Sequence, residues 1–237
     1  MLLDCVSYNA LADAYLRYGD YRHVAPDLLK PEARIPYHLQ LITSLRADVI
    51  GLQEAEQPLI AALKATDKWQ QFWSPKEGGE PDGCLMLVRR GIPVANFTTH
   101  AYSDGSNHIM QSVVIGGVVF VNTHIKWAPV GQRNHSGIAQ TEELLEQLST
   151  KRRAVIFADC NDRPNGPVRR LVEQAGFINT CGNGPTALIG QERAALDLIA
   201  VRGVRATRIK TAFRPEGIPN TECPSDHIPV MASIEVD

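Results

Sequence analysis

The stretch 157-FADCNDRPNG-166 decides how the rest of this sequence is interpreted. An apolar run from Ala154 to Ala158 stops at an acid, Asp159, and an amide follows two positions later at Asn161. Asp and Asn bond to their own backbone and often begin turns, so this pair alone is an ordinary strand-to-turn boundary. A functional interpretation requires other polar residues that also end apolar runs and meet this pair in space.

Length and composition indicate an ordinary globular protein. The chain has 237 residues, of which 44% are hydrophobic and 21% charged. This length permits one two-sheet domain or two smaller units, and because no linker interrupts the sequence we expect one domain over residues 1–237. The net charge of -2 gives no overall attraction to a polyanion, so a nucleic acid would have to bind a local patch.

The cysteines and the apolar runs bear on the compartment. Five cysteines are widely spaced without a C-x-x-C motif, which argues against a disulfide framework and a zinc knuckle. The N-terminus lacks the features of a signal peptide, and the longest apolar run, Val113 to Val121, is far short of the ~20 residues that a membrane helix needs. We therefore expect a cytoplasmic monomer with reduced thiols, no membrane segment and no stable protein partner.

Apolar patterns predict more strands than helices. Helical spacing is seen after Pro36, around Leu59 to Leu63, after Ser136 as a cap, and from Pro167 to Gly176. The predicted strands lie at 2–7, 48–52, 84–88, 112–115, 118–121, 154–158, 196–201, 207–212 and 228–234, and Gly116-Gly117 joins two of them as a tight hairpin. Residues 11–34 look irregular. This mixture predicts mixed sheets covered by helices, not a purely parallel doubly wound fold.

Several of these strands begin or end at a polar residue. Each such residue has an ordinary explanation alone, as a turn, a cap or a structural histidine, but strand ends at one edge of a sheet lie side by side. Their oxygen-rich side chains suit Mg²⁺ or Mn²⁺ and not zinc, and amides leave coordination positions for water and phosphate. The pattern therefore predicts a site for metal-assisted phosphoester hydrolysis. The residues are Asn9, Glu54, Asn122, His124, Asp159, Asn161, Asp197, Asp226 and His227.

Six stretches occur in an order that strongly resembles the endonuclease/exonuclease/phosphatase superfamily. They are "SYNALAD", "DVIGLQE", "VNTHIKW", "FADCNDRP", "LDLIAV" and "PSDHIPV". The resemblance spans nearly the whole chain and implies a DNase I-like, four-layer α/β sandwich, in which two mixed β-sheets pack face to face and helices flank them. "SYNALADAY" with its Tyr-rich continuation and "THIKWAP" are most similar to the deadenylase branch that includes nocturnin and the Angel proteins. Ala158 and Cys160 depart from the family's usual Gly and apolar residue.

The resemblance implies a metal and water site. Glu54 would be the principal Mg²⁺ ligand, with Mn²⁺ as a substitute, and Asn9 would help directly or through water. Asp226 would contact a second metal or support His227. Asp159 would orient and deprotonate the attacking water, which requires an ionised carboxylate.

The resemblance also implies how the phosphate is held. Asn161 would hold one phosphate oxygen through its amide, and His124 would donate to another. His227 would stabilise the charge that builds on phosphorus, and Asp197 would bond to its far nitrogen and fix the tautomer. In-line attack without a covalent enzyme intermediate is expected.

Other residues have two open interpretations. Arg133 and His135 would grip a substrate phosphate or simply face solvent, and Trp127 with Pro129 would stack on a base or pack. Asn122 is assigned to substrate binding. Lys151 to Arg153 form a basic run that a helix end also explains. Cys160 is not expected to be a nucleophile, because alternation along an extended chain points its side chain away from its neighbours.

The leading prediction is a Mg²⁺-dependent phosphodiesterase that acts on RNA 3′ ends, like a deadenylase. One alternative is a phosphatase for terminal or 2′,3′-cyclic phosphates of RNA, and another is hydrolysis of nucleotides or small phosphoesters. A non-catalytic RNA-binding module is the competing class. It predicts a lost ligand, whereas every named position is filled.

Overall fold

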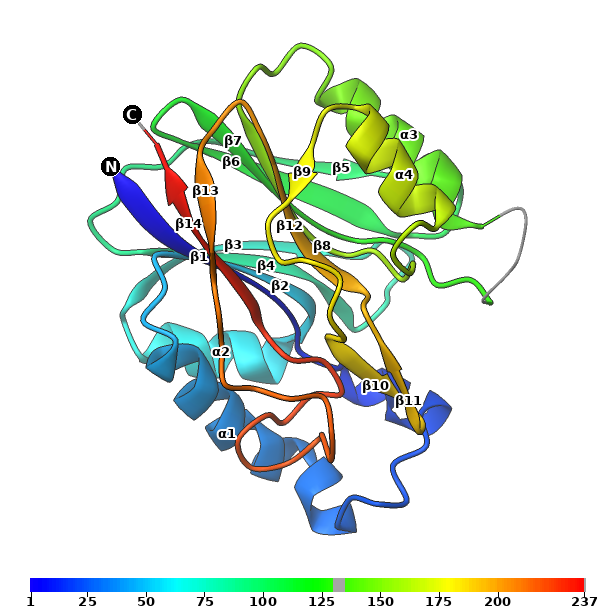
Figure 1. Cartoon of the computed structure of the whole chain (residues 1–237). Helices are drawn as coiled ribbons and strands as arrows, with labels where there is room; N and C mark the ends of the chain where they lie inside the picture. The colour runs from blue at the N-terminus through cyan, green and yellow to red at the C-terminus, as the bar shows by residue number, and fades with distance from the viewer. Residues whose placement is uncertain (130–134, 237) are drawn as a thin grey trace.

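Two six-stranded β-sheets pack face to face with helices on both outer surfaces (Figure 1). The structure is a computed structural model that describes residues 1–129 and 135–236. The helices are α1 Pro31–Ser44, α2 Gln57–Ala65, α3 Gly137–Gln147 and α4 Pro167–Gln174, with short 3₁₀ helices η1 Asp13–Tyr18 and η2 Pro26–Leu29. This is the four-layer sandwich predicted from the sequence.

The first sheet has the order β13-β14-β1-β2-β4-β3. Its strands are β1 Leu2–Asn9, β2 Val49–Glu56, β3 Trp69–Pro75, β4 Asp82–Arg89, β13 Ala206–Ile209 and β14 Val230–Glu235. β1 and β2 are parallel, and the other pairings are antiparallel.

The second sheet has the order β5-β6-β7-β8-β12-β9. Its strands are β5 Ala95–Ala101, β6 Ile109–Ile115, β7 Val118–His124, β8 Ala154–Asp159, β9 Ile178–Asn179 and β12 Asp197–Arg202. β7 and β8 are parallel, and the remaining pairs are antiparallel. A small hairpin of β10 Ala187–Ile189 and β11 Glu192–Ala194 stands apart from both sheets.

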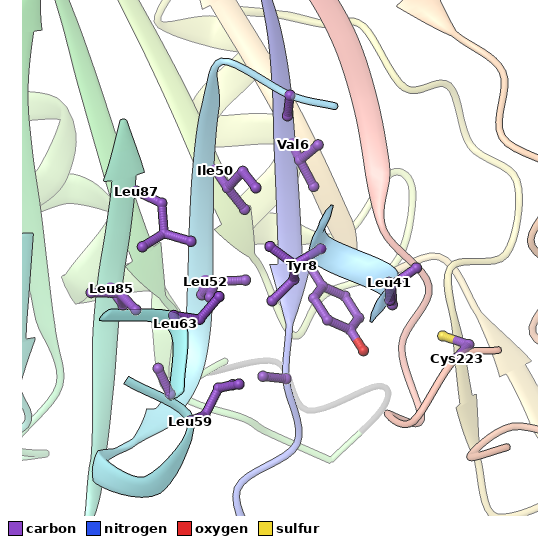
Figure 2. Packing of buried hydrophobic residues seen from close by; sticks show 14 of the residues in the cluster. Val6, Tyr8, Leu41, Ile50, Leu52, Leu59, Leu63, Leu85, Leu87 and Cys223 are labelled. Carbon is purple, nitrogen blue, oxygen red and sulfur yellow. The ribbon is translucent and has the colours of Figure 1, made fainter. Parts of the chain in front are cut away.

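Alternation along each strand builds separate apolar layers. On β1, Leu3 and Cys5 face the second sheet, whereas Val6 and Tyr8 face α1 and α2. Figure 2 shows the helix-facing layer, where residues of β1, β2 and β4 meet Leu41 of α1 and leucines of α2. A third layer lies beneath α3 and α4. These layers fix the sheets and therefore the strand ends that carry polar residues.

Some local expectations need correction. α1 begins at Pro31 and not after Pro36, which lies inside the helix. Ser136 precedes α3, but its hydroxyl donates to the Trp127 carbonyl and does not cap the helix. Strand β5 was missed because nearly all its side chains are exposed or half-buried, so no apolar alternation marks it. The predicted hairpin is confirmed, since Gly116 and Gly117 join β6 to β7 with φ values of 55° and 74°.

Within the described ranges, no helix has both the length and the apolar character needed to span a bilayer.

Candidate active site

Strand register in the second sheet brings three predicted residues together. In the parallel pair β7–β8, His124 lies beside Asp159, and in the antiparallel pair β8–β12, Asp197 lies directly opposite Asp159. All three end or begin their strands, so the side chains gather at one edge of the sheet. Asp159 Oδ1 also accepts a 2.9 Å hydrogen bond from the backbone N–H of Asn161, so the ordinary turn interpretation holds as well.

The first sheet supplies Asn9 and Glu54 from the ends of β1 and β2. The pairing of β2 with β4 shifts between Leu52 and Ala55, and Glu54 has a left-handed φ of 53° at this irregularity. Such a bulge re-aims a side chain, and here it turns Glu54 toward Asn9. The Asn9 amide nitrogen donates to Glu54 Oε1 and to Asp159 Oδ2, both at 2.9 Å, so one side chain joins the two sheets.

Burial makes this cluster a good cation site. It raises the pKa of Glu54 to about 7 and raises the pKa of Asp159 as well. The ligand atoms of Glu54, His124 and Asp159 lie within 4.8 Å of one another. Asp197 and Asp226 add two more carboxylates, so hard oxygen donors are in excess of the nearby positive charge. A divalent cation fits this donor set.

His227 lies beside the cluster as a positively charged donor. Its Nδ1 is 2.9 Å from Asp197 Oδ2, and its Nε2 is 3.7 Å from Asp159 Oδ2. Burial alone would lower the pKa of His227, but the neighbouring Asp197 and Asp159 carboxylates raise it well above its usual value. The bond to Asp197 therefore orients an imidazolium whose Nε2 faces the Asp159 carboxylate.

His124 is held neutral, and its tautomer follows from Asn161. The Asn161 amide nitrogen donates to the Ile125 carbonyl and to His124 Nε2, both at 2.8 Å, so His124 carries its proton on Nδ1. Burial, and then the charge of Lys76, lowers the pKa of His124. Nδ1 is buried without a partner and lies 3.8 Å from Glu54 Oε1. A free N–H thus points into the site, where a phosphate oxygen would accept it.

This geometry revises the role predicted for Asn161. Both of its amide hydrogens are used within the protein, so the structure favours an orienting role for His124 over direct contact with phosphate. His135 supports the same turn, since its Nε2 donates to the Asn161 carbonyl at 3.1 Å and its Nδ1 accepts from Gly137 N–H. His135 is 7% exposed, so its side chain does not face solvent.

The other predicted binding residues are scattered. Asn122 is fully buried, and its amide bonds to the Leu52 and Leu85 carbonyls and to the Gln53 side chain, which favours a role in joining the sheets. Trp127 is 58% exposed and Pro129 is also exposed, so both are available to a ligand. Arg133 lies outside the described residues.

Two residues that support the candidate site, Lys76 and Tyr21, were not predicted from the sequence. Lys76 is buried at the rim of the site, pairs with Asp82 at 2.8 Å and donates to the Tyr15 hydroxyl. Tyr21 donates to Asp226 at 2.7 Å and so fixes a predicted metal ligand. A glycine-rich loop that follows Lys76 and a Tyr-rich segment before α1 were the only signals.

A cavity of about 600 Å³ opens beside these residues. Its lining includes Tyr15, Tyr18, Lys76 and His108, and the His108 ring meets the His124 ring edge-on at 5.5 Å. The cavity therefore adjoins the Glu54–His124–Asp159 cluster. Its lining combines aromatic rings with two cations, Arg17 and Lys76, and two acids, Asp13 and Glu80.

Cys160 takes no part in this cluster. Its side chain is buried in the layer beneath α3 and α4, and burial raises the pKa of its thiol to about 12. A neutral, enclosed thiol is not a nucleophile at ordinary pH, in agreement with the sequence prediction.

Solved structures share this fold. The chain superimposes on ANGEL2, a 2′,3′-cyclic phosphatase, with a TM-score of 0.86 and 15% identity over 99% of this chain and 95% of that one. A complex of ANGEL2 with adenosine-2′,3′-vanadate gives 0.83, with 17% identity and the same coverage. The human Nocturnin catalytic domain with bound sulfate gives 0.73, with 19% identity over 100% and 95% of the chains.

Two comparisons of the amino-acid sequence gave different results. No curated protein sequence matches the chain. A sequence model of the Endonuclease/Exonuclease/phosphatase family matches residues 26–227, a span that includes every residue predicted for the site from the sequence except Asn9. By this match, the chain belongs to the endonuclease/exonuclease/phosphatase family.

Proposed function

We propose that this protein is a Mg²⁺-dependent phosphodiesterase that hydrolyses phosphoester bonds at RNA 3′ ends. The observation that carries the proposal is the hydrogen bond from Asn9 to both Glu54 and Asp159, because it gathers the ends of two separate sheets into one acidic site. Glu54 would hold the ion, with Asn9 and Asp226 in supporting positions. Bound Mg²⁺ supplies positive charge to a phosphate oxygen.

The protein's own groups have distinct tasks. Asp159 lies 3.7 Å from the His227 imidazolium and is fixed by Asn9 and the Asn161 N–H, so its carboxylate is held rigidly for accepting a proton from water. His124 offers its free Nδ1–H to a non-bridging oxygen. His227 offers its Nε2–H to a phosphoryl oxygen, on which negative charge builds in the transition state, and Asp197 keeps the imidazole protonated. In-line attack by the water inverts the configuration at phosphorus.

The adjoining cavity supports a nucleotide substrate. Tyr15 and Tyr18 present aromatic rings, with centroids 6.3 Å apart, and aromatic faces bind bases without reading sequence. Arg17 lies 4.8 Å above the Tyr18 ring and adds a cation to the same wall. The volume of about 600 Å³ is within the range of pockets that accept a small ligand.

Hydrolysis of a 2′,3′-cyclic phosphate is the second candidate. The comparison with ANGEL2 favours it, since that protein is a 2′,3′-cyclic phosphatase and binds adenosine-2′,3′-vanadate. A cyclic phosphate is itself a phosphodiester at the 3′ end of a chain. The same residues would therefore serve the ring opening, in which the leaving oxygen stays on the same ribose. That step leaves a terminal 2′- or 3′-phosphate, and a second hydrolysis by water at the same site would release inorganic phosphate.

A panel of end-labelled RNAs tests the proposal and separates its two forms. RNAs and DNAs of one sequence, ending in 3′-OH, 3′-phosphate or 2′,3′-cyclic phosphate, are incubated with Mg²⁺, Mn²⁺ or EDTA. Shortening of the 3′-OH RNA supports the exonuclease, and loss of the terminal phosphate at constant length supports the phosphatase. Binding of RNA without hydrolysis of any substrate would identify a non-catalytic module and overturn the proposal.

A further inference from the structure

A basic segment lies away from the catalytic cluster. Residues 198–215 contain five Arg or Lys residues and no acid, although the chain as a whole carries a net charge of -2. Arg202 is occupied, because it donates to the carbonyls of Leu148, Lys151 and Ala175. The other cations of this segment are Arg205, Arg208, Lys210 and Arg214, and all four are exposed.

Three of these cations line a groove of about 450 Å³. Its lining residues come from β13 and the loop that follows it, from residues 184–186 ahead of the β10–β11 hairpin, and from the start of β14. Figure 1 shows where these elements lie. Arg208, Lys210 and Arg214 lie along it, above an apolar floor that includes Ile209 and Phe213. A groove with a basic wall and an apolar floor suits single-stranded nucleic acid, whose backbone is anionic and whose bases are flat.

The groove carries more positive than negative charge, and its one acid, Glu216, is influenced by the charges of both Arg193 and Arg214. Within the described parts of the chain, Arg208, Lys210 and Arg214 form no ion pair within 4 Å, and the one acid that lines the groove, Glu216, pairs with Arg193 at 2.5 Å. Gly182 makes room for Arg208, since a Cβ atom at Gly182 would lie 3.0 Å from the guanidinium Nη1.

Protection of a sheet edge does not account for the whole set. β13 is the edge strand of the first sheet, and cations on an edge strand discourage pairing with another chain. That explanation covers Arg208, but β13 ends at Ile209, so Lys210 and Arg214 lie beyond the strand. They add charge where there is no edge to protect.

The groove shares a wall with the catalytic site. Ile228 lines the groove and follows His227, and its N–H donates to the Thr186 carbonyl, another lining residue. The Thr186 hydroxyl accepts from the N–H groups of Leu196 and Asp197. A ligand in the groove is thus separated from the Asp197–His227 pair by a single layer of chain.

We propose that this groove binds the phosphodiester backbone of the RNA substrate at nucleotides outside the active site. The proposal rests on the proposed function for its choice of ligand. It predicts that the groove determines the preference for long over minimal substrates, because a substrate confined to the catalytic cluster does not reach the groove.

The test uses an Arg208→Gln/Lys210→Gln variant and a matched control. The control, Lys64→Gln/Arg170→Gln, also loses one Lys and one Arg, both exposed and placed on α2 and α4. Binding of a 5′-fluorescein-labelled, unstructured 20-nucleotide RNA is measured in EDTA by anisotropy at several salt concentrations. Turnover of a dinucleotide is measured separately in Mg²⁺.

The groove variant should bind the 20-mer on the order of tenfold more weakly at 0.1 M salt, and its log–log salt slope should fall by about 1.4 for two lost phosphate contacts. The control variant and dinucleotide turnover should match the wild type. Equal losses in both variants, or an unchanged Kd and slope in the groove variant, would overturn the proposal. Arg214→Gln, in the loop beyond the strand, provides an independent second variant.

The two proposals fail differently. If the wild type hydrolyses the dinucleotide and the groove variant binds RNA normally, the proposed role of the groove is refuted and the proposed enzymatic function stands. If the wild type hydrolyses no substrate but binds RNA more tightly than the groove variant does, the proposed enzymatic function is refuted and the proposed role of the groove stands.

Discussion

Replacing Glu54 by Gln should make the metal-free protein more stable above neutral pH. Burial raises the pKa of Glu54 from the usual 4.5 to about 7, so the folded protein keeps a proton that the unfolded chain has already released. The unfolded state binds fewer protons across this interval, and the free energy of unfolding therefore falls as pH rises. A glutamine cannot ionise and escapes this loss.

The magnitude follows from that interval and from one hydrogen bond. At about 1.4 kcal/mol per pH unit, the wild type should lose about 3 kcal/mol between pH 4.5 and 7 through Glu54 alone. Glutamine points an amide N–H at the Ala12 N–H, which now donates to Glu54 Oε2, and this should cost about 1 kcal/mol. The variant should thus be less stable by about 1 kcal/mol at pH 4.5 and more stable by about 2 kcal/mol at pH 8.

Urea unfolding in EDTA, followed by circular dichroism from pH 4.5 to 8, measures the free energy of unfolding of both proteins. The two stability curves should cross within this pH range. Glu80→Gln, a change of the same kind at an exposed position, should show no crossing. Added Mg²⁺ should restore the wild type at pH 8, by about 2.7 kcal/mol at a hundredfold excess over Kd, and stabilise Glu54→Gln much less. A constant difference between wild type and variant at all pH values would refute the reasoning.

Four further outcomes are expected. Asp159→Asn should keep its circular dichroism spectrum while kcat falls by roughly 10²–10⁴, because the base is lost. Asp197→Asn should lower kcat by about 10²–10³ and shift the alkaline limb of the pH–rate profile to lower pH, since its carboxylate raises the pKa of His227. Cys160→Ala should keep the wild-type kcat, and a reduced rate would return the thiol to consideration. Gly51→Ala should cost about 1–3 kcal/mol in urea unfolding, because a Cβ there would lie 2.8 Å from Phe157 Cβ, whereas Gly184→Ala has open space and serves as control.

The layers of the fold, and the strand ends that bring most candidate site residues together, were predictable from the sequence, because both depend on local patterns. Asp159 and Asp197 each mark the end of an apolar run, and strand pairing then places them opposite one another. The hairpin turn at Gly116 and Gly117 was predictable for an equally local reason. Both turn residues have positive φ, which glycine adopts readily, so the Gly-Gly pair itself indicates the turn. The family motifs added the order in which these ends assemble.

What escaped prediction depends on contacts between distant segments. The Asn161 amide seemed free for phosphate until the Ile125 carbonyl and His124 were seen to take both hydrogens. The polar character of Asn122 gave no sign that it lies wholly between the sheets. Lys76 sits in a stretch whose composition indicates an ordinary loop, and only Asp82 and Tyr15 draw it inward. Such partners become visible only when the chain has folded.

Because the hydrogen bond from Asn9 to Asp159 crosses from one sheet to the other, the distance between the two sheets affects the geometry of the proposed active site. Asn9 belongs to the first sheet and Asp159 to the second, and the side chains packed between the sheets, including Met86 of β4 and Phe157 of β8, set how far apart the two residues stand. A substitution that changes the volume of a side chain between the sheets, even one that the fold tolerates, would shift the site residues of one sheet relative to those of the other. Turnover should therefore respond to changes in this inner packing that leave the melting temperature unchanged.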